Sequence, residues 1–432
     1  MSARRQHAAG TAAPRSTATA PVPVEAHLAE VLAAVAPLAP VRVPLASALG
    51  RVLAAEVVAA SPVPAFDNSA MDGYAVRWAD VGGAGEQTPA RLEVVAEVAA
   101  GSGEDPAIGP RQAVRIMTGA PVPSAADTIV PVEHTAAHRS DGAWADVGGP
   151  VEVVVAAAEG AHVRRASEDL GVGDVVLRAG RVLTPYRLGA AAAAGVATVE
   201  VRPAPRVAVV ATGDELVPAG APTARGQIPD SNSVLLAGVV ASAGAEVVAV
   251  SHVGDAPEAL LAELDRLGRE AAPDVVICTG GVSVGAHDVV KAALTGRGVT
   301  FRSVAMQPGK PQAVGRLESG ALLFGLPGNP VSVAVSFEVF VRPALQAMQG
   351  LDAVGAPRAE AEVAEGWRTP PARRQYMPVT FDADGRIRRA TAGGSGSHLA
   401  GGLAHAEAFA VVGAEVDEVR AGDRLAVMLV GS

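Results

Sequence analysis

The chain has 432 residues, of which 49% are hydrophobic, and a formal net charge of −10, so the length predicts about three domains with sizeable cores. A single cysteine excludes an internal disulfide framework and a zinc site built from cysteines, and no apolar run reaches the roughly 18 residues that a membrane span needs. The acidic balance and the lack of a basic tract argue against nucleic acid as the main partner, so any anionic ligand has to be held by loops, a few cations or a metal ion.

The N-terminal segment predicts a tail followed by two helices. Residues 1–23 contain arginines but no acid and develop no apolar face, which favours a disordered tail over a transit peptide. Apolar side chains then recur at helical spacing from Leu28 to Leu38 and again from Leu49 to Val57. We therefore expect two amphipathic helices to open the folded part of the chain.

A polar loop and a β-rich region follow these helices. Ala65–Val76, AFDNSAMDGYAV, holds two carboxylates, an amide and a hydroxyl within six positions, which favours a functional loop over a simple turn. From Arg91 to Val155, short β runs broken by Gly and Pro predict a small, mostly-β inserted domain. The polar cluster HVRRASEDL at His162–Leu170 fits either a site or a solvated ion-pair network. At Tyr186–Ala194 the pattern returns to helix.

After a Pro-rich linker at Pro203–Pro205, strand and helix patterns alternate over about 140 residues. Such alternation predicts one doubly wound, largely parallel sheet. Three of the strands end in polar, Gly-rich loops: TGDE at Thr212–Glu215, TGGVSVGAHD at Thr279–Asp288 and GLPGNPVS at Gly325–Ser332. Since right-handed crossovers bring the carboxyl ends of parallel strands to one edge, we expect these loops to converge.

The loop after Val275–Cys278 carries the chemistry that an anion site needs. Gly280 and Gly281 let backbone N–H groups approach an anion, Ser283 adds a hydroxyl, and Asp288 can hold a cation against it. The alternative is a tight strand-to-helix turn in which Asp288 caps the helix. No loop fits G-x-G-x-x-G or G-x-x-x-x-G-K-S/T, which disfavours a nicotinamide or P-loop site.

Three further residues of this domain are informative. Cys278 lies inside the apolar strand, which favours a core residue over a nucleophile. The only two lysines, Lys291 and Lys310, both follow Gly-rich loops in an otherwise Arg-rich chain, so either a role in the site or solvated surface charge is open for each. Beyond Gly350, β patterns around a hairpin turn at Asp384-Gly385 predict a small β-barrel or sandwich.

The motifs FDNSAMDGYAV, RIMTGAPVP, RRASED, TGDEL, GGVSVGAHD, PGKP and GLPGNPVS, in this order, resemble those of the molybdopterin molybdenumtransferases of molybdenum cofactor synthesis, the family that includes the carboxyl-terminal domain of gephyrin. The likeness begins at about residue 24 and covers almost all of the rest. It implies a multidomain α/β plus β fold. The expected parts are a tail (1–23), a split helical linker and dimerisation domain (24–62 with 160–202), an inserted mostly-β domain (63–159), a doubly wound molybdopterin-binding α/β domain (203–350) and a C-terminal β-barrel (356–432).

The resemblance also implies an activity. Adenylylated molybdopterin and molybdate are bound, the phosphoanhydride is hydrolysed with the help of Mg²⁺, AMP leaves, and the dithiolene sulfurs capture molybdenum. It further implies a cytoplasmic homodimer that can meet the molybdopterin adenylyltransferase, with neither nucleic acid nor a membrane as partner. Two rival functions stay open, namely adenylylation of molybdopterin by ATP and a non-catalytic scaffold of the gephyrin type.

Roles for individual residues follow from the resemblance alone. Asp72 is expected to reach the pocket of a partner subunit, and Pro327, Pro330, Arg373 and Ser397 correspond to the region that holds molybdate. The catalytic set is Asp72, Asp169, Glu215, Asp288 and Lys310, and the metal set is Glu215, Asp255 and Asp288. The substrate-binding set is Thr118, Thr212, Gly213, Asp214, Asp255, Gly280, Gly281, Ser283, Pro327, Pro330, Arg373 and Ser397.

Two positions depart from the family pattern. Gln307 stands before the PGKP turn where many relatives carry lysine, so one cation is missing near the anions. We therefore expect anionic ligands to depend more on Mg²⁺ and Lys310 here. Pro378 stands where some relatives have a second arginine.

Overall fold

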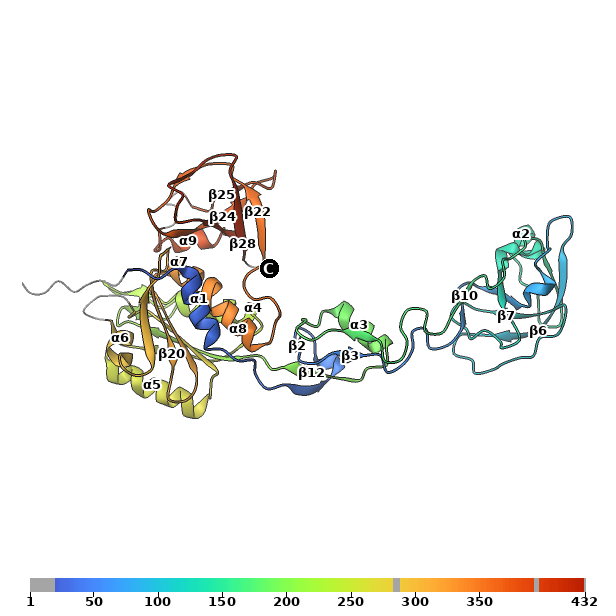
Figure 1. Cartoon of the computed structure of the whole chain (residues 1–432), viewed down its shortest axis with the longest axis horizontal. Coiled ribbons are helices and arrows are strands. Elements are labelled where there is room, and N and C mark those ends of the chain that lie inside the picture. Colours follow the sequence, from blue (N-terminus) through green and yellow to red (C-terminus); the bar gives the residue numbers. More distant parts are fainter. Residues whose placement is uncertain (1–19, 283–287, 392–395, 431–432) are drawn as a thin grey trace, which may run out of the picture. The chain divides into compact units, whose positions relative to one another are not determined.

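The computed structural model describes residues 20–282, 288–391 and 396–430 (Figure 1). Contacts within the chain separate two compact units: Val41–Val201 forms one, and Met1–Pro40 with Arg202–Ser432 forms the other. The division into five parts expected from the sequence therefore stays a prediction. Most of the expected tail lies outside the described residues. Its C-terminal end is ordered, because Val22 N–H donates to Ser303 O at 2.7 Å.

The larger unit is built on a six-stranded sheet that confirms the predicted α/β fold. Its first four strands in spatial order are parallel, and the last two form an antiparallel edge. The parallel strands are runs of buried, mainly β-branched residues, as expected where both faces of a sheet are covered. The spatial order is β16 (Glu246–Val253), β13 (Arg206–Thr212), β17 (Val275–Thr279), β21 (Leu322–Leu326), β20 (Pro311–Arg316) and β18 (Val299–Ser303).

Helices cover both faces of this sheet (Figure 1). Side chains of β13 alternate between the two cores, with Val207 and Val209 in one and Ala208 and Val210 in the other. Cys278 belongs to the second core and is fully buried, and burial raises the pKa of its thiol to about 12. The prediction of a core cysteine is confirmed. On the first face lie α1 (Val24–Ala33), α4 (Asn232–Ser242), α7 (Pro330–Ser336), η4 (Phe337–Val341) and α8 (Arg342–Met348), and on the second lie α5 (Pro257–Glu270) and α6 (Val289–Leu294).

Elements α7, η4 and α8 continue one another from Pro330 to Met348. By length and hydropathy these 19 residues could cross a membrane, but 83% of the apolar window is buried inside the unit. They form a core helix of the α/β fold.

The C-terminal β region of the same unit has a second six-stranded sheet. As predicted, the Asp384-Gly385 turn joins two antiparallel strands, with Gly385 at φ 76°. The first strand of this sheet, Met306–Gln307, comes from the α/β part of the chain and pairs in parallel with the segment after Arg373. This pairing brings Arg373 to the edge of the α/β fold. The main strands are β19 (Met306–Gln307), β24 (Arg374–Phe381), β26 (Ala408–Val412), β28 (Arg424–Leu429) and β22 (Arg358–Glu362), with β25 (Ile387–Arg389) paired to β24.

The smaller unit contains the predicted inserted β region. Its five-stranded sheet includes β5 (Gly73–Val76), directly after the AFDNSAMD loop. Any side chain at Gly73 would lie 2.1 Å from Val130 O, so the close pairing of these strands requires glycine. The order is β8 (Thr128–Pro131), β5, β7 (Gln112–Ile116), β6 (Ala90–Val98) and β9 (Pro150–Val153).

The second helix expected near the N-terminus is wrong. The segment from Leu49 to Val57 forms a turn and two short strands, β2 (Val52–Leu53) and β3 (Val57–Val58). Gly50, at φ 74°, interrupts the helical pattern. The segment instead pairs with distant chain, for example Leu53 N–H to Arg181 O at 3.0 Å. The helix predicted at Tyr186–Ala194 is confirmed as α3 (Pro185–Ala193), and α1 packs in the other unit, so the expected helical domain is a mixed α/β structure.

Candidate functional site

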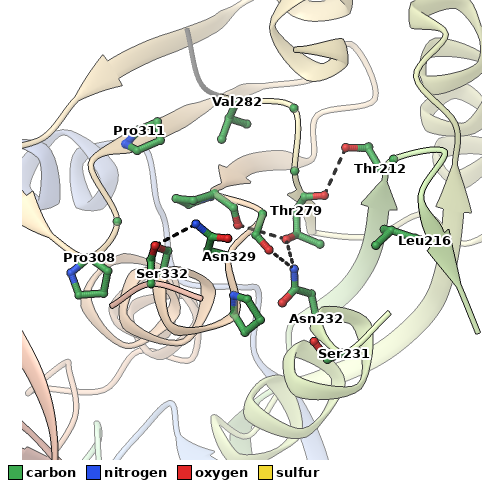
Figure 2. A pocket seen from close by; sticks show the side chains of 18 of the residues that line it. Thr212, Leu216, Ser231, Asn232, Thr279, Val282, Pro308, Pro311, Asn329 and Ser332 are labelled. Atoms are coloured by element: carbon green, nitrogen blue, oxygen red, sulfur yellow. Dashed lines mark hydrogen bonds between the residues drawn. The ribbon is translucent and has the colours of Figure 1, made fainter. Parts of the chain in front are cut away.

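A pocket of about 770 Å³ opens beyond the carboxyl ends of β13, β17 and β21 (Figure 2). Its walls come from the loops that follow these strands, together with the turn before β20 and the segments that contain Arg373 and Ser397. Ligands of open α/β sheets gather at this edge. The prediction that the three Gly-rich loops converge is confirmed. The predicted site residues that line the pocket are Thr212, Gly213, Glu215, Asp255, Gly280, Gly281, Asp288, Lys310, Pro327, Pro330, Arg373 and Ser397.

The loop after β17 has no room for side chains at its two glycines. Gly280 lies at φ 94°, and a Cβ there would be 2.7 Å from Thr212 O; at Gly281, with φ 62°, it would be 2.9 Å from Val289 Cγ1. Both positions therefore require glycine on conformational and steric grounds. The predicted hydroxyl of Ser283 lies outside the described residues.

We expect Gly280→Ala to destabilise the protein more than Gly220→Ala. Both glycines have a positive φ, but a Cβ at Gly220 meets nothing within 4 Å, whereas one at Gly280 meets Thr212. The shared backbone strain costs about 1–2 kcal/mol, and the overpacking at Gly280 adds about 1–3 kcal/mol. Chemical denaturation of both variants measures the difference. Equal losses of stability would contradict the steric argument.

Four carboxylates lie on the β13–β16–β17 side of the pocket: Glu215, Asp230, Asp255 and Asp288. Asp214 does not line the pocket; its Oδ1 accepts the N–H of Asp255 at 3.2 Å and so holds the turn on which Asp255 sits. Asp230 Oδ1 accepts the N–H of Ser233 at 3.0 Å, at the start of α4. Three of the four carboxylates are thus the ones predicted from the sequence.

The Asp288 side chain does not act as a helix cap. It stands just before α6 but makes no capping hydrogen bond, and its Oδ2 is buried with no hydrogen-bond partner in the described part of the chain. A buried carboxylate oxygen without a donor is costly unless a cation or a ligand completes it. This favours the site interpretation of Asp288 over the capping alternative.

No group of three His, Cys, Asp or Glu side chains that could hold a metal ion occurs among residues 20–282, 288–391 and 396–430. Glu215, Asp255 and Asp288 are therefore not a closed metal cage in this structure. Mg²⁺ rarely needs one, because it keeps several waters and binds through one or two carboxylates plus phosphate oxygens of a ligand. The unpartnered Asp288 oxygen in the pocket wall fits an ion shared with a ligand in this way.

Two cations, Lys310 and Arg373, line the pocket from the β20 side of the sheet. Lys310 sits in the turn before β20, where a buried amide holds the backbone: Gln312 Nε2 donates to Gly309 O and to Ser336 Oγ, both at 2.7 Å. Lys291 does not line the pocket. Only one of the two lysines is therefore part of the site.

Arg373 and Ser397 tie the C-terminal β region to the pocket. Arg373 Nη1 donates to Gln307 Oε1 at 3.3 Å, so Gln307 orients the guanidinium. The hydroxyl of Ser397 accepts a hydrogen bond from Asn329 Nδ2 at 2.9 Å, and Val331 N–H donates to Ser397 O at 3.2 Å. A guanidinium and a hydroxyl beside the GLPGNPVS loop are suited to a tetrahedral oxyanion.

Three predicted residues, Asp72, Thr118 and Asp169, belong to the smaller unit. Asp72 Oδ1 accepts hydrogen bonds from both the backbone N–H and the hydroxyl of Thr118, each at 2.7 Å. These bonds, the backbone one first, hold the pKa of Asp72 below its usual range, so this exposed side chain is a carboxylate at neutral pH. Asp169 is also exposed.

The RRASED cluster is anchored to the same loop. Asp67 accepts hydrogen bonds from Ala166 N–H at 2.8 Å and Arg165 Nη1 at 2.7 Å, which lower the pKa of Asp67 in that order. The ion-pair interpretation of the cluster therefore explains the position of Arg165, which pairs with Asp67. The hydrogen bonds of Asp67 do not include Asp169, so they do not explain that residue.

Sequence reasoning missed one central residue of the pocket. The sequence pattern places Asn232 only at the start of a helix, yet this residue is buried and reaches two of the loops (Figure 2). One signal could have found it: Asn232 follows Asp230 and Ser231 directly and lies in the first turn of α4. Buried positions of a helix are usually apolar, so a buried amide there indicates a specific hydrogen-bonding role.

The fold and the pocket together define a class of protein. It has a doubly wound α/β domain whose pocket is lined by glycine loops, carboxylates and two cations, and the chain also contains a β-rich unit and a C-terminal β region. Family models match at three places: "MoeA N-terminal region (domain I and II)" at residues 22–195, "Probable molybdopterin binding domain" at 208–347 and "MoeA C-terminal region (domain IV)" at 360–430.

Relatives agree with these matches. Molybdopterin molybdenumtransferase 2 of Mycobacterium tuberculosis is 43% identical over 396 residues, covering 90% of this chain and 94% of that protein. The Haemophilus influenzae molybdopterin molybdenumtransferase is 33% identical, covering 89% and 92%. The crystal structure of the molybdopterin biosynthesis MoeA protein from Pyrococcus horikoshii superposes with a TM-score of 0.79 at 29% identity, covering 96% of this chain and all of that one. The chain belongs to the MoeA family of molybdopterin molybdenumtransferases.

Proposed function

We propose that the chain is a molybdopterin molybdenumtransferase that inserts molybdate into adenylylated molybdopterin and releases AMP. The observation that carries this proposal is the separation of charge across one pocket. Four carboxylates lie on one side, and Lys310 and Arg373 lie on the other. A plain anion site would not place so many acids beside the ligand. A site that binds phosphates through a divalent cation and an oxyanion through its own cations would.

The carboxylate side is suited to the phosphoanhydride. Asp288, with Glu215 or Asp255 as a second ligand, would hold Mg²⁺ against its phosphates, while the backbone around Gly280 and Gly281 approaches them. Bound Mg²⁺ reduces the negative charge that an attacking water oxygen meets. In the hydrolysis, the water hydroxyl joins one phosphorus and its proton goes to the oxygen that leaves, so AMP separates from molybdopterin.

The cation side is suited to molybdate. Arg373, oriented by Gln307, can donate in a fork to two oxygens, and Ser397 can donate through its hydroxyl. Lys310 adds a mobile positive charge from the adjoining turn. Pro327 and Pro330 shape the loop between the two sides.

We further propose that the enzyme works as a cytoplasmic homodimer and receives its substrate from the molybdopterin adenylyltransferase. Large apolar side chains are exposed on the smaller unit and would leave water on contact with a partner. Val172 is 68% exposed and Tyr186 is 90% exposed. In the homodimer, Asp72 would complete the pocket of the partner subunit together with Thr118 and Asp169.

The test is a reconstitution with purified protein, adenylylated molybdopterin, Mg²⁺ and molybdate. AMP release by chromatography and activation of a cofactor-free molybdoenzyme are expected only when all components are present. ATP consumption without adenylylated substrate would favour the adenylyltransferase instead. Full cofactor activity in a strain that lacks the gene would favour a scaffold.

A further inference from the structure

A buried amide joins two neighbouring loops that line the pocket, the one after β17 and the one after β21 (Figure 2). Asn232, the first residue of α4, is 8% exposed. Its Nδ2 donates to Gly328 O at 2.6 Å and to Thr279 Oγ1 at 3.2 Å. The hydroxyl of Thr279 in turn donates to Pro327 O at 3.3 Å. One amide group therefore connects the end of β17 with the loop after β21.

Among the described residues, one backbone hydrogen bond connects the ends of the two strands at the start of these loops. Strands β17 and β21 pair up to Thr279 and Leu326, and Gly280 N–H donates to Leu326 O at 3.1 Å. In the described part of the chain, no backbone hydrogen bond joins the two loops beyond that one. The spacing between Gly281 and the Pro327–Pro330 loop therefore depends on side chains.

The two ends of the amide differ in importance. Both N–H bonds of Nδ2 are used, whereas Oδ1 is buried without a hydrogen-bond partner in the described structure. A buried acceptor without a partner lowers stability, so any stabilisation that this side chain provides comes from the two hydrogen bonds of Nδ2. An isosteric carboxylate would place a second oxygen where the amide now donates to Gly328 O.

We propose that Asn232 is a positioning residue that sets the separation of the Gly280–Gly281 loop and the Pro327–Pro330 loop, and thereby the fit of a nucleotide phosphate against both. The proposal rests on the proposed function in that AMP is taken as the ligand. It requires no step of the transferase reaction and no particular metal ligand.

A matched control exists in the same unit. Gln349 is 5% exposed, and its Nε2 donates to Ala243 O at 2.9 Å and to Leu345 O at 3.1 Å, away from the pocket. Asn232→Asp and Gln349→Glu each replace a buried amide donor of two hydrogen bonds by an acceptor. Both variants therefore lose stability for the same reason, and only the first alters the pocket.

The experiment measures AMP affinity by calorimetry and melting temperature for the wild type and both variants. Asn232→Asp is expected to weaken AMP binding about tenfold or more, while Gln349→Glu keeps the affinity within about twofold despite a similar fall in melting temperature. Thr279→Val, which keeps the volume but removes the relaying hydroxyl, is expected to weaken binding in the same direction. It serves as the test if Asn232→Asp does not fold.

The outcomes separate the two proposals. If the wild type binds AMP and both Asn232→Asp and Thr279→Val bind it equally well, the positioning role is overturned. An equal loss of AMP affinity in Gln349→Glu also overturns it, because a general loss of stability would then explain the weaker binding. If the wild type itself does not bind AMP, the proposed function fails first.

Discussion

Asp288→Asn is expected to slow AMP release from adenylylated molybdopterin by about 10²–10⁴-fold. The substitution keeps the shape of the side chain but removes its charge and one acceptor oxygen. In the structure, Asp288 Oδ2 is buried in the pocket wall with no donor among the described residues, so a bound cation or ligand is the natural partner for it. Without the carboxylate, the positive charge or the donor group of that cation or ligand would lack a negatively charged partner.

The magnesium dependence reveals how Asp288 acts. If the carboxylate helps to hold Mg²⁺, half-maximal activity of Asp288→Asn is expected at a higher magnesium concentration, and saturating magnesium restores part of the rate. A rate defect that is independent of magnesium would instead assign Asp288 to the attacking water. Asp265→Asn, which changes an exposed carboxylate on α5, is the control for a lost negative charge in the same unit. Full activity of Asp288→Asn would remove this residue from the mechanism.

Asp72→Asn is expected to lower activity by about 10²-fold or more on its own, and to regain activity when mixed with Asp288→Asn. If each pocket takes Asp72 from the partner subunit, a heterodimer of the two variants has one pocket with both carboxylates. Random exchange at equal concentrations then restores about a quarter of the sites. The measurement is AMP release after joint refolding, compared with each variant alone.

Two outcomes would contradict a shared site. Activity that stays absent in a mixture whose subunit exchange is shown by differently tagged chains would mean that Asp72 does not act across subunits. An unchanged rate for Asp72→Asn alone would mean that it does not act at all. Because Thr118 holds Asp72 as a carboxylate, Thr118→Val is expected to lower the rate less than Asp72→Asn does, and mainly at acidic pH.

Lowering the pH tests the same contact. The pKa of Asp72 is depressed in the folded protein, so its carboxylate persists as pH falls below the ordinary value for an aspartate and is lost only near the depressed folded value. Removal of the Thr118 hydroxyl leaves the backbone N–H as donor, so the pKa of Asp72 stays lowered, but by less than in the wild type. The acid limb of the pH–rate profile is therefore expected to move towards neutral pH in Thr118→Val.

Local patterns in the sequence were enough to predict the α/β alternation, the burial of Cys278 and the meeting of three glycine loops. A strand of β-branched residues, a helix period and a Gly-rich ending are all visible within short windows, and the handedness of crossovers then leaves one edge for the loops. From the sequence, the glycines at positions 280 and 281 were explained only by the close approach of backbone N–H groups to an anion; their positive φ and the lack of room for a Cβ became visible in the structure.

The partners of each segment, in contrast, emerged only from the folded chain. The segment from Leu49 to Val57 has helical spacing, but its strands gain hydrogen bonds from residues more than a hundred positions away, which outweigh a weak local preference. The contact of Arg373 with Gln307 and the bridge from Asn232 to Gly328 likewise join segments far apart in the chain. Periodicity carries no information about which loops a side chain reaches, because that depends on how the strands are ordered in the sheet.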